Sequence, residues 1–302
     1  MTGGTLRTAG AFTTSDGTRL RVLDEGPADA PVTVVFVHGW TLTMHAWDRV
    51  ASGLPKAAGS QPRSLRFDLR GHGGSDPAQP GSASIQRCAE DLAELVRARA
   101  PEGPLVLVGH SMGGMTIMAL AEAHPELFAR RVAGVALVST SGGDLGKPGF
   151  RLPRPVAAVA NRGERMIRKR LAASHGTRLS SRSRWLQPGM RWLLFGARPE
   201  RADVAVTADW VAACHPANMA AYRETLAEHD RLAALAALRS IPTIVLSGLS
   251  DRLTPHSHAR RIAEALPDAK LLIYADAGHM LPLERADEVT ARIAELVTRA
   301  IR

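Results

Sequence analysis

The sequence predicts an α/β fold, in which an open, mostly parallel β-sheet carries helices on both of its faces. Strand-like and helix-like segments alternate through both halves of the chain, as they do where helices connect parallel strands. Several strand candidates, such as PVTVVFVHG at 31–39, are short apolar runs rich in β-branched residues, which is typical of strands buried on both faces. With 302 residues, 45% of them hydrophobic, the chain can bury one large core.

The first half of the chain supplies most of these elements. Residues 13–23, TTSDGTRLRVL, are predicted to form a hairpin with Asp16 and Gly17 at its turn. We expect strands at 31–39, 64–69, 104–109 and 132–140. Helices are expected at about 46–57, 84–100 and 112–123, the last of them stopped by Pro125.

The second half resumes the alternation only after a long interval. Strands are predicted at 241–248 and 269–276, and helices at about 256–266 and 286–301. From 142 to 228 the strand signal is absent, Pro148, Pro153 and Pro155 open the segment, and helical patterns fill it. We therefore predict a core formed by 1–141 and 229–302, and an inserted helical cap at 142–228. Such an insertion would lie over the carboxyl edge of the sheet, where ligands bind in these folds.

The positive charge is concentrated in the predicted cap. The whole chain has a formal net charge of +9, but the stretch from Lys147 to Asp203 holds fourteen Lys and Arg against three Asp and Glu. This local charge of +11 leaves about −2 for the remainder. It has two interpretations: a solvated helical face, or an attraction for an anionic substrate or acidic surface. No nucleic-acid-binding motif accompanies the charge, so no nucleic-acid partner is expected.

Composition also bears on the compartment. The two cysteines, Cys88 and Cys214, give no disulfide framework. The first residues lack the apolar stretch of a secretion signal, and no run of about 18 apolar residues occurs, so stable membrane insertion is not expected. We expect a cytoplasmic protein whose oligomeric state the sequence leaves open.

One short motif points to chemistry. Gly109-His110-Ser111-Met112-Gly113 matches G-x-S-x-G, with a strand before it and a helix after it. The glycines allow a turn so tight that the serine hydroxyl stands clear of the sheet, and the start of the helix favours a developing negative charge. Ser111 is therefore predicted to be a nucleophile.

A serine nucleophile needs a base, and the base needs an orienting acid. The strand at 241–248 leads to Asp251, and the strand at 269–276 leads to His279, so both residues follow strand ends. We predict His279 as the base and Asp251 as the acid, with Asp144, which follows the strand at 132–140, as the alternative acid.

Other polar residues receive supporting roles. We expect these to stabilise loops rather than to transfer protons: His38, His72, His110, Asp68, Asp76 and Glu284.

The motifs HGW at 38–40, FDLRGHGGSD at 67–76, GHSMGG at 109–114, SGLSDRLTP at 247–255 and AGHMLPLERADEV at 277–289 resemble those of the α/β-hydrolase superfamily. The chain order Ser111, Asp251, His279 is also the family's. The resemblance implies an eight-stranded α/β-hydrolase sheet and a variable lid at about 142–228. It also implies an oxyanion hole formed by the backbone N–H groups of Trp40 and Met112.

These residues predict acyl transfer. Relatives that open epoxides or displace halide have an aspartate where this chain has Ser111. We expect a carboxylic ester hydrolase with no metal and no cofactor, acting on a small-to-medium apolar ester, with Trp192, Phe195 and Trp210 of the cap as substrate contacts. The alternatives are hydrolysis of a thioester, a lactone or a C–C bond, perhydrolysis, and a ligand-binding role with little turnover.

Overall fold

The computed structural model describes residues 6–145, 166–174 and 176–302. Pro148, Pro153, Pro155 and Arg165 lie outside the described residues. Within them the chain forms a single eight-stranded sheet with the order β1-β2-β4-β3-β5-β6-β7-β8. The strands are β1 (Leu6–Thr13), β2 (Arg19–Gly26), β3 (Thr33–Val37), β4 (Arg63–Phe67), β5 (Leu105–His110), β6 (Val132–Val138), β7 (Thr243–Gly248) and β8 (Lys270–Tyr274).

The sheet is parallel except at one edge. Strands β1 and β2 form the predicted hairpin, in which Thr13 pairs with Arg19, and β2 also runs antiparallel to β4. Gly17 in the hairpin turn has a φ of 86°, a conformation that glycine adopts without strain. The remaining neighbours pair in parallel, which confirms the predicted fold class.

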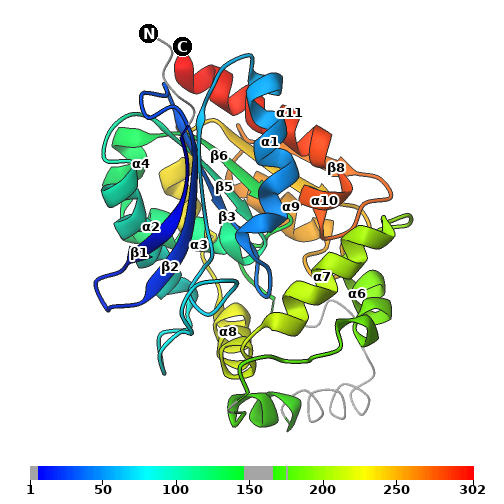
Figure 1. Cartoon of the computed structure of the whole chain (residues 1–302). Coiled ribbons are helices and arrows are strands. Elements are labelled where there is room, and N and C mark those ends of the chain that lie inside the picture. The colour runs from blue at the N-terminus through cyan, green and yellow to red at the C-terminus, as the bar shows by residue number, and fades with distance from the viewer. Residues whose placement is uncertain (1–5, 146–165, 175) are drawn as a thin grey trace.

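Helices cover both faces of the sheet, and this explains why every residue of the central strands β3 and β5 is buried and most are apolar (Figure 1). On one face α1 (Asp48–Ala58) and α11 (Ala286–Ile301) pack together and contribute to one buried cluster. On the other face lie α2 (Ile85–Arg99), α3 (Met112–Ala123), α4 (Pro125–Arg131) and α9 (His256–Ala265).

One expectation about these helices is corrected. Pro125 was expected only as the stop of the preceding helix, but it occupies the first turn of α4, a helix that the sequence patterns did not predict. A proline fits there because its missing N–H would have no partner in a first helical turn and its fixed φ suits a helix. His124 lies between the two helices with a ψ of 55°, so the chain changes direction at that residue.

Between β6 and β7 the described residues contain helices and no strand. They are helical residues 166–172, the 3-10 helices Ser183–Trp185 and Ala233–Leu238, and the α-helices α6 (Gln187–Leu194), α7 (Arg201–Ala213) and α8 (Pro216–Glu228). Figure 1 shows α6, α7 and α8 together at one end of the molecule, beyond the edge of the sheet. An isolated antiparallel bridge joins Gly143 to Asp230, so the chain leaves the core and returns to it at neighbouring points. The domain boundaries at 142 and 228 remain a prediction.

Of the helices that the structure describes, none combines the length and the apolar character needed to cross a bilayer.

Candidate active site

Ser111 lies between the end of β5 and the start of α3, in a backbone conformation that serine rarely adopts. Its φ is 52° and its ψ is −119°. Three hydrogen bonds hold it there: its N–H donates to Val138 O at 2.9 Å, and its carbonyl accepts from the Thr140 hydroxyl at 2.7 Å and from Gly114 N at 2.9 Å. The strained turn is thus fixed by the neighbouring strand β6 and by the first turn of α3.

Close backbone approach explains two glycines around this serine. A Cβ on Gly113 would lie 2.2 Å from Val37 O, so only glycine lets α3 begin against the end of β3. A Cβ on Gly39 would lie 3.1 Å from Ser111 Cβ and 2.8 Å from His110 Nδ1. The segment that leads into Trp40 therefore passes directly beside Ser111.

His279 and Asp251, predicted from two strand ends, are brought together. His279 Nδ1 and Asp251 Oδ2 are 2.8 Å apart, and both side chains are buried. With Asp251 ionised, Nδ1 carries the proton and donates it, which leaves Nε2 as the basic nitrogen of a neutral ring. His279 lines the same cavity as Ser111.

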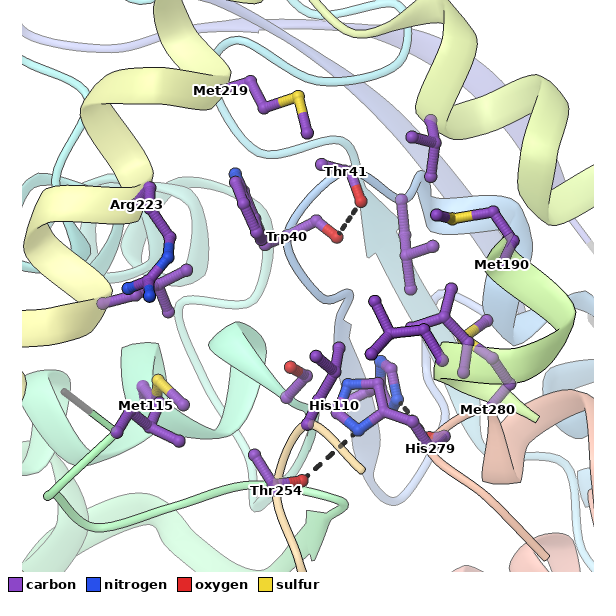
Figure 2. Close-up of a pocket in the computed structure, with 18 residues that line it drawn as sticks. Trp40, Thr41, His110, Met115, Met190, Met219, Arg223, Thr254, His279 and Met280 are labelled. Carbon is purple, nitrogen blue, oxygen red and sulfur yellow. Dashed lines mark hydrogen bonds between the residues drawn. The ribbon is translucent and has the colours of Figure 1, made fainter. Parts of the chain in front are cut away.

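Asp251 is held as a carboxylate by its surroundings. Burial by itself raises the pKa of Asp251, but the contacts with His279 and with Thr254 outweigh burial and lower it below its ordinary value. Oδ1 accepts from the N–H groups of Leu253 and Thr254 at 2.8 and 2.9 Å, and Oδ2 accepts from the Thr254 hydroxyl at 2.8 Å. Sequence reasoning did not single out Thr254, whose hydroxyl also lies 3.3 Å from His279 Nδ1 (Figure 2).

Asp144, the alternative acid, is engaged elsewhere. Asp144 lies at the start of the segment that leads away from β6. Its carboxylate accepts a hydrogen bond from the Arg261 guanidinium.

The loop that carries His279 is fixed from two sides. Glu284 accepts from Gly278 N at 3.0 Å, from Met280 N at 3.2 Å and from Gly196 N at 2.7 Å. Leu194 O accepts from His279 N at 2.7 Å. Glu284 thus has the anchoring role that was expected of it, and it ties the end of α6 to the loop that carries His279.

The three loop histidines also have supporting contacts. His38 Nε2 accepts from Leu69 N at 2.9 Å, His72 Nδ1 lies 3.0 Å from Arg70 O, and His110 Nε2 lies 2.9 Å from His279 O. Asp68 accepts from Met44 N and Gly74 N at 2.7 and 2.8 Å, and Asp76 accepts from Arg19 N at 3.0 Å.

These buried histidines make the stability of the fold sensitive to acid. Burial lowers the pKa of His38 to about 4, and burial with a neighbouring histidine lowers that of His72 and of His110 to about 3. An unfolded histidine titrates near 6.5, so below that pH the unfolded chain binds protons that the folded chain does not. The contribution of each ring is therefore fully present above about pH 6.5 and is lost as the pH falls towards the folded value.

We expect the free energy of unfolding to fall by roughly 1 kcal/mol per buried histidine between about pH 7.5 and 5.5. Urea unfolding at the two pH values measures this loss. The difference in the free energy of unfolding between the two pH values should be smaller in His72→Asn, whatever that substitution costs in stability at neutral pH. It should not shrink in His45→Asn, because a contact with Asp48 raises the pKa of His45. An equal loss in His72→Asn and the unaltered protein would contradict the assignment.

Ser111 and His279 open onto a cavity of about 310 Å³ between the sheet edge and the helices α6, α7 and α8. Its size is at the lower end of the range for small-molecule sites. Figure 2 shows the side chains that surround it. Most are apolar, including Met115, Met190, Leu193, Leu194, Met219 and Leu226. Trp40 also lines it, whereas Met112, the first residue of α3, is fully buried beside Ser111.

The three aromatic residues predicted as substrate contacts lie elsewhere, which corrects that prediction. Trp192 is 65% exposed, and its ring stacks on the Arg252 guanidinium at 5.3 Å. Phe195 is buried in a small cluster with Leu42 and Met280, and Trp210 packs against that cluster. None of the three is among the described residues that line the cavity.

The true lining residues carry a signal that sequence reasoning missed. Met190, Leu193 and Leu194 on α6 are spaced at i, i+3 and i+4, and so lie on one face of that helix. The same face excludes Trp192. The prediction favoured large aromatic residues over this spacing. The rotation of α6 about its own axis depends on packing against distant segments, which the local sequence does not reveal.

Among the described residues, no group of His, Cys, Asp and Glu side chains is arranged to hold a metal ion.

Comparison with known proteins identifies the family to which the fold belongs. A family model described as the alpha/beta hydrolase fold matches residues 32–286. The chain is 30% identical over 269 residues, 87% of this chain and 97% of the other, to a pimeloyl-[acyl-carrier protein] methyl ester esterase of Aromatoleum aromaticum.

Two further proteins illustrate the range of the similarity. Over 163 residues, 54% of this chain and 51% of the other, it is 33% identical to a putative 2-succinyl-6-hydroxy-2,4-cyclohexadiene-1-carboxylate synthase of Bacillus subtilis; this match thus spans about half of that relative's length. A thermophilic esterase from Thermogutta terrifontis, solved with malate bound, superimposes with a TM-score of 0.76 at 26% identity, over 98% of this chain and 100% of the other.

Proposed function

The chain belongs to the α/β-hydrolase family, and we propose that this hydrolase is a serine esterase that cleaves a carboxylic ester through an acyl-enzyme. One observation carries the proposal: Ser111 and His279 line one apolar cavity, and Asp251 holds His279 Nδ1 at 2.8 Å. A nucleophile, a base and an orienting acid are the groups that this reaction requires.

In the first half of the reaction, Ser111 Oγ attacks the ester carbonyl while His279 Nε2 takes the hydroxyl proton. The carbonyl oxygen becomes an oxyanion, which the backbone N–H groups of Trp40 and Met112 stabilise. The proximity of Gly39 to Ser111 and the position of Met112 at the start of α3 support this assignment. His279 then gives its proton to the departing alcohol, and the acyl group remains on Ser111.

In the second half, His279 takes a proton from water, and the resulting hydroxide attacks the acyl-enzyme. The acid is released and Ser111 regains its proton. Asp251 stays ionised throughout, fixes the ring orientation and stabilises the imidazolium that forms in each half.

The cavity favours an apolar group next to the ester. Burial of the methyl and methylene groups of a substrate against these side chains contributes a favourable free energy of about 25 cal/mol per Å² of apolar surface. The methyl ester esterase of Aromatoleum aromaticum supports an ester as the substrate. The two cysteines, Cys88 and Cys214, are both free and buried, which supports a reducing compartment such as the cytoplasm.

A fluorophosphonate probe tests the proposal, because it labels a serine only when base and oxyanion hole activate it. We expect stoichiometric labelling, assigned to Ser111 by peptide mass spectrometry, and hydrolysis of p-nitrophenyl esters by the same preparation. A panel of esters, thioesters and lactones then ranks the alternatives. A folded protein that neither reacts with the probe nor turns over any of the panel would rule out the esterase and leave a binding role.

A further inference from the structure

One residue of the cavity wall carries a permanent charge. Arg223 lines the cavity from α8, and it is the one Lys, Arg, Asp or Glu among the described lining residues. Met219, Arg223 and Leu226 are spaced at i, i+4 and i+7, so one face of α8 presents all three to the cavity. In Figure 2 Arg223 lies on the opposite side of the cavity from Met190.

We propose that Arg223 is a specificity-determining residue that binds a carboxylate carried by the substrate at a distance from the scissile ester. The inference rests on the proposed esterase function and names its substrate class: the ester of a small molecule that keeps a second, free carboxylate. Nothing in the hydrolytic steps changes. The carboxylate selects and orients the substrate, while Ser111 and His279 act on the ester.

The surroundings of Arg223 favour such a contact. The side chain is half-buried in a wall that also includes Met115, Leu145 and Leu226, where a charged group interacts more strongly than in bulk water. A guanidinium is planar and matches a carboxylate with two parallel hydrogen bonds, so it binds that group better than a point charge would. A substrate carboxylate that enters an apolar cavity needs a partner of this kind, because burying it unpaired is costly.

A second observation, independent of the cavity, points to an anionic ligand. Residues 147–203, which lie between β6 and β7 in the sequence, include fourteen Lys and Arg and only three Asp and Glu. Nine of these Lys and Arg and two of the acids lie in the described residues 166–174 and 176–203, and their positive potential raises the local concentration of anions around α6 and α7, which border the cavity. Long-range attraction by the cap and short-range recognition by Arg223 would thus act on the same substrate charge.

Matched pairs of esters test the proposal and locate the carboxylate. The first pair is the mono-p-nitrophenyl ester of adipic acid and its neutral monoamide, which differ in charge on the acyl side. The second pair is p-carboxyphenyl hexanoate and p-carbamoylphenyl hexanoate, which differ on the alcohol side. For each pair, the ratio of kcat/KM for the charged ester to that for the neutral one is measured in unaltered protein, Arg223→Gln and Arg223→Lys.

Arg223→Gln should lower this ratio by roughly 10- to 100-fold in at least one pair, the loss expected for a hydrogen-bonded charge pair. Arg223→Lys keeps the charge but loses the paired hydrogen bonds. Its ratio should lie between that of the unaltered protein and that of Arg223→Gln. The control is Arg201→Gln, which removes one exposed charge of α7 away from the cavity. Its ratio should stay within about threefold of the unaltered protein, because exposed charge is screened.

A ratio that Arg223→Gln leaves unaltered in both pairs would overturn the proposal, and so would an equal fall in Arg201→Gln. Binding of adipate, measured by calorimetry, separates this failure from that of the esterase. If no ester is cleaved but adipate binds and Arg223→Gln weakens it by roughly tenfold or more, the esterase fails and the carboxylate site stands. If esters are cleaved by Ser111 but neither the ratios nor adipate binding depend on Arg223, the esterase stands and the carboxylate site fails.

Discussion

Replacing Ser111 by alanine is expected to lower kcat for ester hydrolysis by about 10⁶-fold, the loss that follows removal of the nucleophile in a serine hydrolase. Alanine lacks the Oγ that would form the acyl-enzyme, so only binding and the oxyanion hole remain. The fold should persist, because the hydrogen bonds that fix residue 111 use its backbone N–H and carbonyl, which alanine retains.

The measurement is kcat for a p-nitrophenyl ester, with circular dichroism to verify folding. Ser139→Ala is the matched control, since Ser139 is also a serine with a positive φ, 45°, and directly follows the neighbouring strand β6, although it is buried. Ser139 is not among the described lining residues, and its replacement should leave kcat within about threefold. If Ser111→Ala kept more than a few per cent of the activity in a pure preparation, Ser111 would not be the nucleophile.

The second large effect concerns the orienting acid. Asp251→Asn should lower kcat by about 10³- to 10⁴-fold. The amide of asparagine would donate to Nδ1 of His279, which places the ring proton on Nε2, where the base must accept one. The stabilisation of the imidazolium by the Asp251 charge would be lost as well.

Asp144→Asn is the matched control, because Asp144 follows strand β6 as Asp251 follows strand β7. It should change kcat by less than about threefold, since its carboxylate contacts Arg261 rather than His279. Comparison of kcat for the two variants on one ester decides between the acids. The reverse order of effects would show that the acid lies after β6.

Much of the core could be predicted because its determinants are local. The apolar runs of β3 and β5 and the helical patterns of α3 and α11 appear within a few residues of their observed bounds. Helix α4 escaped prediction because a proline after a helical pattern was interpreted as an end, although it also begins a helix. The sequence of seven residues that forms α4 is too short for periodicity to identify it.

The candidate catalytic residues could be predicted for a topological reason. In a parallel sheet, all carboxyl ends of strands meet at one edge, so residues that follow separate strand ends converge without any further information. Ser111 follows β5, Asp251 follows β7 and His279 follows β8, so strand ends placed all three candidates at one edge, although Asp144, which follows β6, remained an alternative acid.

The walls of the cavity could not be predicted in the same way. Whether a cap side chain faces the cavity depends on the rotation of its helix, and that rotation is decided by contacts between segments far apart in sequence. Trp192 is turned outward, where Arg252 stacks on its ring, while Phe195 is drawn into the cluster around Met280.

The sequence by itself determined the sheet, the tight turn at Ser111 and the candidates for base and acid, because each depends on local pattern or on strand ends that must meet. Only the tertiary structure decided that Asp251 rather than Asp144 contacts His279, that Glu284 ties the loop of His279 to the end of α6, and that Arg223 enters a mostly apolar wall. These features arise from the packing of helices against a sheet edge. Rotation of one helix about its axis by the angle between successive residues, about 100°, changes which side chains face the cavity and which face solvent.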